Sequence, residues 1–187
     1  MTELTEGPYD WDDLAADERP EGYIDLGSLL MPNFEGWELR LQVDESSGTV
    51  LSAMLVDEEG MVEVRPFAAP RNGDLWGEVR PQLVAAATEQ GGQTGEHEGP
   101  FGTELVCAVP VQMPDGNTGT QQSRIVGVNG PRWFLRATFL GRPAHDVEAG
   151  QTWNQLIAHM VVRRGSDPVP PGEALVLTMP PGARPQV

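Results

Sequence analysis

The chain has 187 residues, enough for one domain with its own hydrophobic core, and 39% of them are hydrophobic. It contains 28 acidic residues and 12 arginines but no lysine, which gives a formal net charge of −16. This charge argues against direct binding to nucleic-acid phosphates, which needs clustered positive charge, and favours a basic protein partner. The sequence has no apolar run of about 18 residues and no signal-peptide pattern, so we expect no membrane contact. The single cysteine, Cys107, cannot form an internal disulfide, and this predicts a cytoplasmic protein.

Half of the net charge lies in the first 25 residues, where nine acids and one arginine give −8. We therefore expect residues 1–22 to form an acidic, disordered arm. Two aromatic residues interrupt this arm in the sequence GPYDWDD. Either the aromatic pair packs onto the domain, or the arm docks onto a basic partner. The interaction residues in the second case would be Tyr9, Trp11, Asp12 and Asp13.

Alternation of apolar and polar residues predicts an antiparallel meander in the first half of the domain. It follows an apolar segment at 23–32 that we expect to be extended, and the turn sequences ESSG and DEEG separate its strands. The predicted strands are 37–44, 49–56 and 61–67.

Helical spacing predicts a first helix that starts at Leu75, with Asp74 as its N-cap and Gly91 after its end. Pro81 is expected to kink this helix or to lie in a first turn that begins later. Strands follow at 102–111, 120–128 and in the stretch GPRWFLRATFLGRP, and a second helix is predicted within 145–164.

The predicted order is thus βββαβββα, in a single domain that covers residues 23–166. This pattern indicates an α+β fold with a mainly antiparallel sheet of about six strands and two helices packed on one face. The order is loosely similar to the PsbP/Mog1-like α/β sandwich by analogy. Residues 167–187 form a Pro-rich extended tail, in which LVLTM could be a short strand or a cover for the core.

The turn before GPRWFLRATFLGRP decides which arginines share a face of the sheet. A two-residue Asn129-Gly130 loop would place Arg124 on the apolar face, whereas a three-residue loop over 129–131 places Arg124 opposite Arg136. We expect the three-residue loop, with a positive φ at Gly130, because it separates apolar from polar residues. Phe134 then lies on the arginine face as an exposed aromatic residue that suits a partner surface.

Facing arginines leave two interpretations. Neighbouring acids such as Glu63 or Glu38 neutralise them, or the guanidinium groups bind a nucleotide or carboxylate. The candidate ligand-binding residues in the second case are Arg71, Arg124 and Arg136.

We predict no metal, cofactor or catalytic residues, since the three histidines show no ligand spacing. Cys107 is expected to be a buried packing residue, and GEHEGPFG (95–102) a solvated loop.

Several stretches together resemble an uncharacterised actinobacterial family with a domain of unknown function. They are IDLGSLLMP, FAAPRNGDLWGEVR, GPFGTEL, GPRWFLRATFLG, VVRRG and DPVPPGEALVLTMP, and they span most of the chain. This family is commonly encoded near a dUTPase and an OB-fold nucleic-acid-binding protein, and the resemblance therefore implies nucleotide or DNA housekeeping. It implies no catalytic residues.

The leading hypothesis is a non-enzymatic cytoplasmic interaction domain whose acidic arm binds a basic partner. In one variant the arm mimics nucleic acid for a DNA-binding partner. The alternative is a small-anion-binding protein or weak enzyme that uses the arginine cluster.

Overall fold

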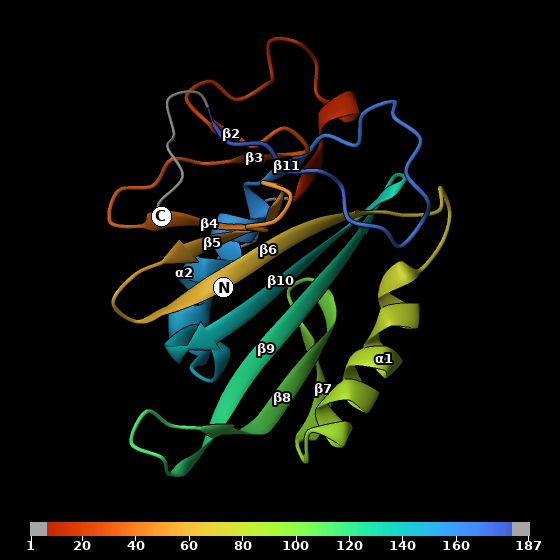
Figure 1. The fold of residues 1–187 in the computed structure, drawn as a ribbon. Coiled ribbons are helices and arrows are strands. Elements are labelled where there is room, and N and C mark those ends of the chain that lie inside the picture. The colour runs from red at the N-terminus through yellow and green to blue at the C-terminus, as the bar shows by residue number, and fades with distance from the viewer. Residues whose placement is uncertain (1–6, 181–187) are drawn as a thin grey trace.

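A seven-stranded antiparallel sheet forms the centre of the fold (Figure 1), in a computed structural model that describes residues 7–180. The spatial order of its strands is β4-β5-β6-β10-β9-β8-β7. The strands are β4 (Glu38–Val43), β5 (Val50–Val56), β6 (Gly60–Ala68), β7 (Gln93–Gly99), β8 (Gly102–Gln112), β9 (Thr118–Gly130) and β10 (Trp133–Gly141).

A second, four-stranded sheet in the order β1-β11-β3-β2 brings together segments from both ends of the chain. Its strands are β1 (Tyr9–Asp10), β2 (Ile24–Asp25), β3 (Leu29–Met31) and β11 (Val161–Val162). The α+β class is confirmed, but the expectation of one sheet of about six strands is wrong. The short strands of the second sheet were missed because two or three residues are too few to show an alternating pattern.

The two helices begin at side-chain caps. Asp74 accepts a hydrogen bond from the Gly77 N–H at the start of α1 (Leu75–Glu89), as predicted, and Pro81 lies inside this helix. Asp146 caps α2 (Val147–Ala158) in the same way, after a short 3-10 turn at Arg142–Ala144. The second helix is shorter than expected because the chain leaves it and enters β11.

The helices pack on opposite faces of the large sheet, so the prediction that both lie on one face is wrong. Trp133, Leu135 and Phe139 of β10 belong to the main core together with Trp153 of α2. Phe134 points to the other face, where it joins a smaller core under α1. Figure 1 shows α1 on the near side of the sheet and α2 behind it. β10 therefore buries apolar side chains on both faces, although Arg136 and Thr138 also lie on the α1 face.

The register of β9 and β10 also differs from the prediction. Gly130 pairs with Trp133, so Pro131 and Arg132 form the turn, and the positive φ of 63° falls on Arg132. Arg124 lies opposite Phe139 and not opposite Arg136. The expected register assumed one apolar and one polar face, and that assumption fails for a strand covered on both sides.

The segment expected to be a solvated loop is the edge strand β7, which pairs with β8 from Gln93 to Gly99. Its residues are mostly exposed and polar, so neither hydrophobicity nor alternation marked it as a strand. This strand places His97 directly opposite Glu104.

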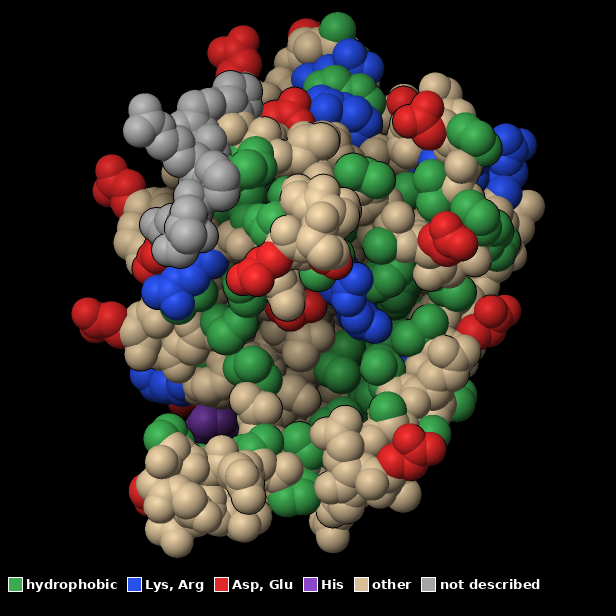
Figure 2. Space-filling model, viewed as in Figure 1, with side chains coloured by type: hydrophobic (Ala, Val, Ile, Leu, Met, Phe, Trp, Pro, Cys, Tyr) green, Lys and Arg blue, Asp and Glu red, His purple; other side chains and the backbone are tan. Residues whose placement is uncertain are grey.

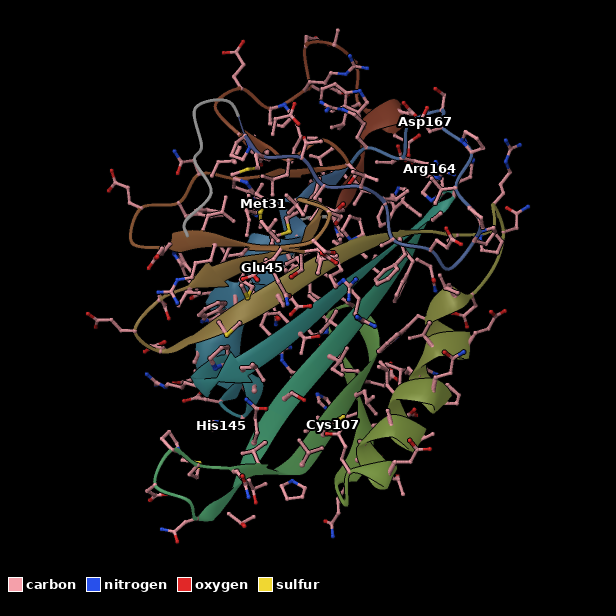
Figure 3. The ribbon with its side chains drawn as sticks, in the orientation of Figure 1. Met31, Glu45, Cys107, His145, Arg164 and Asp167 are labelled. Atoms are coloured by element: carbon pink, nitrogen blue, oxygen red, sulfur yellow. The ribbon has the colours of Figure 1, made fainter. Side chains whose placement is uncertain are left out.

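The described part of the C-terminal tail, up to residue 180, crosses the ends of β5 and β6. Isolated bridges link Ala174 to Phe67 and Leu177 to Val50, and Leu175 and Leu177 are buried in the main core. LVLTM thus covers the core, one of the two roles expected for it. Just before this tail, Arg164 donates to the carbonyl of Asp167 at 3.0 Å, and Figure 3 shows the two residues side by side.

Candidate functional site

A buried ionic cluster lies between the large sheet and α2. The Arg124 guanidinium contacts both carboxylate oxygens of Glu104 at 3.2 Å, and it donates to the Asn154 Oδ1 at 2.7 Å. The guanidinium also stacks over the Phe139 ring at 4.1 Å. Glu104 is 1% exposed and Arg124 is 8% exposed, so the charges are neutralised by each other inside the protein.

One histidine connects this cluster to the surface. His97 on the edge strand β7 lies 3.1 Å from Glu104 through its Nε2, and its side chain is half exposed. A Cβ at Gly99 would overlap the Glu104 carboxylate, so a glycine at this position makes room for the buried acid. Sequence reasoning missed Glu104 because an acid in the apolar run TELVCAV gives no signal of the partner that neutralises it.

Arg124 therefore cannot act as the solvent-facing ligand contact that the sequence predicted. The correct interpretation for this residue is neutralisation by a protein carboxylate, although the acid is Glu104 and not Glu63 or Glu38. Removing either partner of such a pair would leave an uncompensated charge inside the protein. The three predicted arginines do not converge, because Arg124 and Arg136 lie on opposite faces of the sheet.

Arg136 has a different environment from Arg124. It lies opposite Arg65 on β6 and opposite Gly127 on β9, on the same face of the sheet as α1. Burial, reinforced by the nearby Arg65 guanidinium, lowers the pKa of Arg136, while Glu63 opposes this effect. The arginine that faces Arg136 is therefore Arg65, whereas the sequence analysis expected Arg124 in that position.

Phe134 is 1% exposed and does not form the exposed partner surface that the sequence suggested. Its ring centroid lies 5.9 Å from that of Trp76 and 5.9 Å from that of Phe67. A Cβ at Gly127 would overlap the Trp76 ring, so the start of α1 packs directly on the backbone of β9. Arg71, the third predicted ligand contact, is exposed in the loop that precedes α1.

The described part of the acidic arm is held on the body of the domain. Tyr9 pairs with Val161, and the buried Asp10 accepts a hydrogen bond from the Trp133 indole at 2.9 Å. Trp11 begins a 3-10 turn at Trp11–Asp13, and the guanidinium groups of Arg19 and Arg163 each lie over its ring system, 4.2 Å from a ring centroid. This arrangement is the one in which the aromatic pair packs onto the domain.

A cleft of about 250 Å³ lies between this arm and the turn that joins β9 and β10. The arm contributes Pro8, Tyr9, Asp10, Asp13 and Leu14 to its lining. The turn contributes the residues from Val128 to Pro131 and also Trp133. Asp12 and Asp13 are exposed, whereas Asp10 is occupied by Trp133. The sequence analysis identified the arm residues, but the sequence gives no signal that they lie beside the turn that joins β9 and β10.

Cys107 is buried between β8 and α1, as expected, and Figure 3 shows its position beside that helix. Burial raises the pKa of its thiol. Within residues 7–180, no three or more His, Cys, Asp and Glu side chains are grouped so that they could hold a metal ion. In the same range, no helix is both long and apolar enough to cross a membrane.

A family profile matches residues 7–186, which is nearly the whole chain, and its description is a protein of unknown function, DUF3710. The chain belongs to the DUF3710 family. This match confirms the resemblance to a family of unknown function, while its actinobacterial origin and genomic neighbours stay predictions. The match begins at Gly7 and so includes most of the acidic arm.

Among solved structures, the DUF3710 chain is similar to cyanobacterial PsbP (CyanoP) from Synechocystis sp. PCC 6803, whose structure was determined in solution. The two share 9% sequence identity, with a TM-score of 0.41 over 72% of this chain and 86% of the other. A search of curated proteins gave no match to the sequence.

Proposed function

We propose that this DUF3710 protein is a cytoplasmic interaction domain, without a catalytic role of its own, whose acidic arm binds a basic segment of a protein partner. The observation that carries the proposal is the anchored position of the arm beside the cleft. An arm fixed on the domain offers its carboxylates in a constant arrangement, so little conformational entropy is lost when a partner binds.

The charges on the arm support a basic partner. Its exposed acids outnumber its single arginine, Arg19, which is engaged with Trp11. The exposed acids of the described arm are Asp12, Asp13, Asp17, Glu18 and Glu21. Such a concentration of one sign attracts a basic segment, mainly by raising its association rate, and the attraction weakens as salt is added.

The cleft supports an arginine or lysine side chain of the partner as the anchor. Its lining residues include Tyr9 and Leu14, which have apolar side chains or rings, and the exposed acid Asp13. An arginine or lysine has a matching form, with an apolar stem and a charged end. The cleft would hold the stem while Asp13 pairs with the charge.

Deleting residues 1–22 is a poor test, because it also removes Asp10 and the β1 strand and would destabilise the fold. Neutralising the exposed acids is cleaner. We suggest a variant with Asp12→Asn, Asp13→Asn, Asp17→Asn and Glu21→Gln, which leaves Glu18 in its hydrogen bond to the Ala15 N–H.

The matched control removes the same number of negative charges from the body of the domain. Its substitutions are Glu45→Gln, Glu58→Gln, Glu89→Gln and Glu148→Gln, all at exposed positions. Binding of a fluorescent oligo-arginine peptide is measured by anisotropy at low and near-physiological salt. The arm variant should weaken binding about tenfold and the control less than about threefold. Equal losses in the two variants would contradict a specific role for the arm.

A further inference from the structure

Two arginines face each other on the face of the sheet where α1 packs. Arg65 of β6 and Arg136 of β10 are directly paired in the antiparallel register. Paired positions place the two Cβ atoms about 4.5–5.5 Å apart. Both side chains are half-buried, and like charges in this arrangement destabilise a sheet unless something neutralises them.

No carboxylate of residues 7–180 forms an ion pair with either arginine. The Nε of Arg65 is buried and has no hydrogen-bond partner within the same residues. Glu63 lies on the same face of β6, opposite Thr138, and influences Arg136 only through its charge. The pair therefore lacks the neutralisation that Glu104 gives to Arg124 on the other face.

An aromatic ring holds the two guanidinium groups in place. The guanidinium carbons of Arg65 and Arg136 lie 5.5 Å and 5.1 Å from the centroid of the Phe67 ring. Phe67 itself packs against the buried Phe134. These cation–π contacts hold both guanidinium groups beside the same ring, but they do not neutralise the positive charges. Figure 2 shows a basic patch near the middle of the view, with acidic side chains on one side of it and hydrophobic ones on the other.

We propose that Arg65 and Arg136 form a binding site for a phosphate group. Two guanidinium groups present parallel N–H donors that suit an oxyanion, and a dianionic phosphate balances their two charges. A single carboxylate would leave one of the two charges without a counter-charge. The site is separate from the cleft of the acidic arm, which includes neither arginine, so it does not depend on the proposed function.

The ligand could be free inorganic phosphate or the phosphoryl group of a larger molecule. Phenyl phosphate distinguishes the two, because its ring can extend along the face beside Phe67. If phenyl phosphate binds more tightly than inorganic phosphate, the ligand is the phosphoryl group of a larger molecule. If the two bind equally, the ligand is free phosphate. Acetate is the third probe, and binding of acetate as tight as that of phosphate would contradict the choice of a dianion.

The test is isothermal titration of the full chain with inorganic phosphate at low ionic strength, against sodium chloride at matched ionic strength. The wild type should show saturable binding that chloride does not reproduce. Arg136→Gln and Arg65→Gln should each weaken this binding at least about tenfold. Arg71→Gln is the control, since it removes an exposed arginine outside the pair, and it should change the affinity less than about twofold.

Far-UV circular dichroism checks that each variant is folded. If Arg136→Gln fails to fold, Arg136→Lys replaces it, because lysine keeps the charge but loses the planar set of donors, and it should still weaken phosphate binding. The proposal is overturned if the wild type shows no saturable phosphate binding, or if the substitutions in the pair leave the affinity unchanged.

Discussion

Removing one partner of the buried Arg124–Glu104 pair should destabilise the protein strongly. In Arg124→Met the Glu104 carboxylate keeps only His97 among the ionic partners seen in residues 7–180. The Asn154 hydrogen bond and the Phe139 contact are also lost. Breaking a buried ion pair in this way costs about 3–5 kcal/mol of unfolding free energy.

This cost is large compared with the total stability of a domain, which is about 5–15 kcal/mol. For a chain of this length it corresponds to a fall in Tm of about 6–20 °C. Urea denaturation followed by tryptophan fluorescence measures the free energy directly, provided that the slope of the transition is unchanged.

The double variant Arg124→Met/Glu104→Leu tests the cause of the loss. It removes both charges and replaces them with apolar atoms, so it should be more stable than Arg124→Met alone by about 1–3 kcal/mol. The control is Arg40→Met. Arg40 forms an exposed ion pair with Glu38, whose side chains are 53% and 56% exposed, and its loss should cost less than about 1 kcal/mol. If Arg124→Met costs no more than Arg40→Met, or if the double variant is the less stable of the two Arg124 variants, the reasoning is refuted.

Two further predictions concern the face that carries α1. The Gly77 N–H and the Asn129 amide donate hydrogen bonds to the Asp74 carboxylate and lower its pKa. The ionised carboxylate therefore stabilises the folded protein above about pH 4, the ordinary pKa of an aspartate. This stabilisation is lost as the pH falls through the lower pKa of the folded state. Asp74→Ala should therefore cost about 1 kcal/mol at neutral pH, and the difference from the wild type in urea denaturation should narrow in acid. Arg136→Gln should leave stability unchanged or raise it in chloride buffer, because it removes one of two facing charges; a loss above about 1 kcal/mol in thermal denaturation would contradict this.

The sequence predicted the elements well where each strand has one apolar face. Alternation located β4, β5 and β6, and Asp74 marked the start of α1. Prediction failed for β7, because a polar edge strand such as QTGEHEG does not bury either of its faces and gives no periodic signal. It also failed for the short strands of the second sheet, whose pairing depends on contacts between the two ends of the chain.

The candidate sites were harder to predict because they depend on register. Separation of polar from apolar residues places Arg124 opposite Arg136, but Phe134 is buried under α1 on the same face as Arg136, so that face of β10 is not purely polar. Without a clear separation of apolar from polar residues, the sequence does not distinguish between the possible registers of β9 and β10. The error moved Arg124 to the wrong face. The pairing of Arg65 with Arg136 depends instead on β6 and β10 being neighbours in the sheet, which the sequence pattern does not indicate.

Two arginines of the same sheet now provide an internal comparison. Arg124 is nearly fully buried and has a carboxylate, an amide and an aromatic ring as partners. Arg136 is half-buried and has an aromatic ring and a second arginine instead. A charge that serves the fold alone is expected to be neutralised within it, since an unpaired buried charge is costly. Arg124 meets that expectation and Arg136 does not, so the facing pair is where a ligand from outside the chain would gain most.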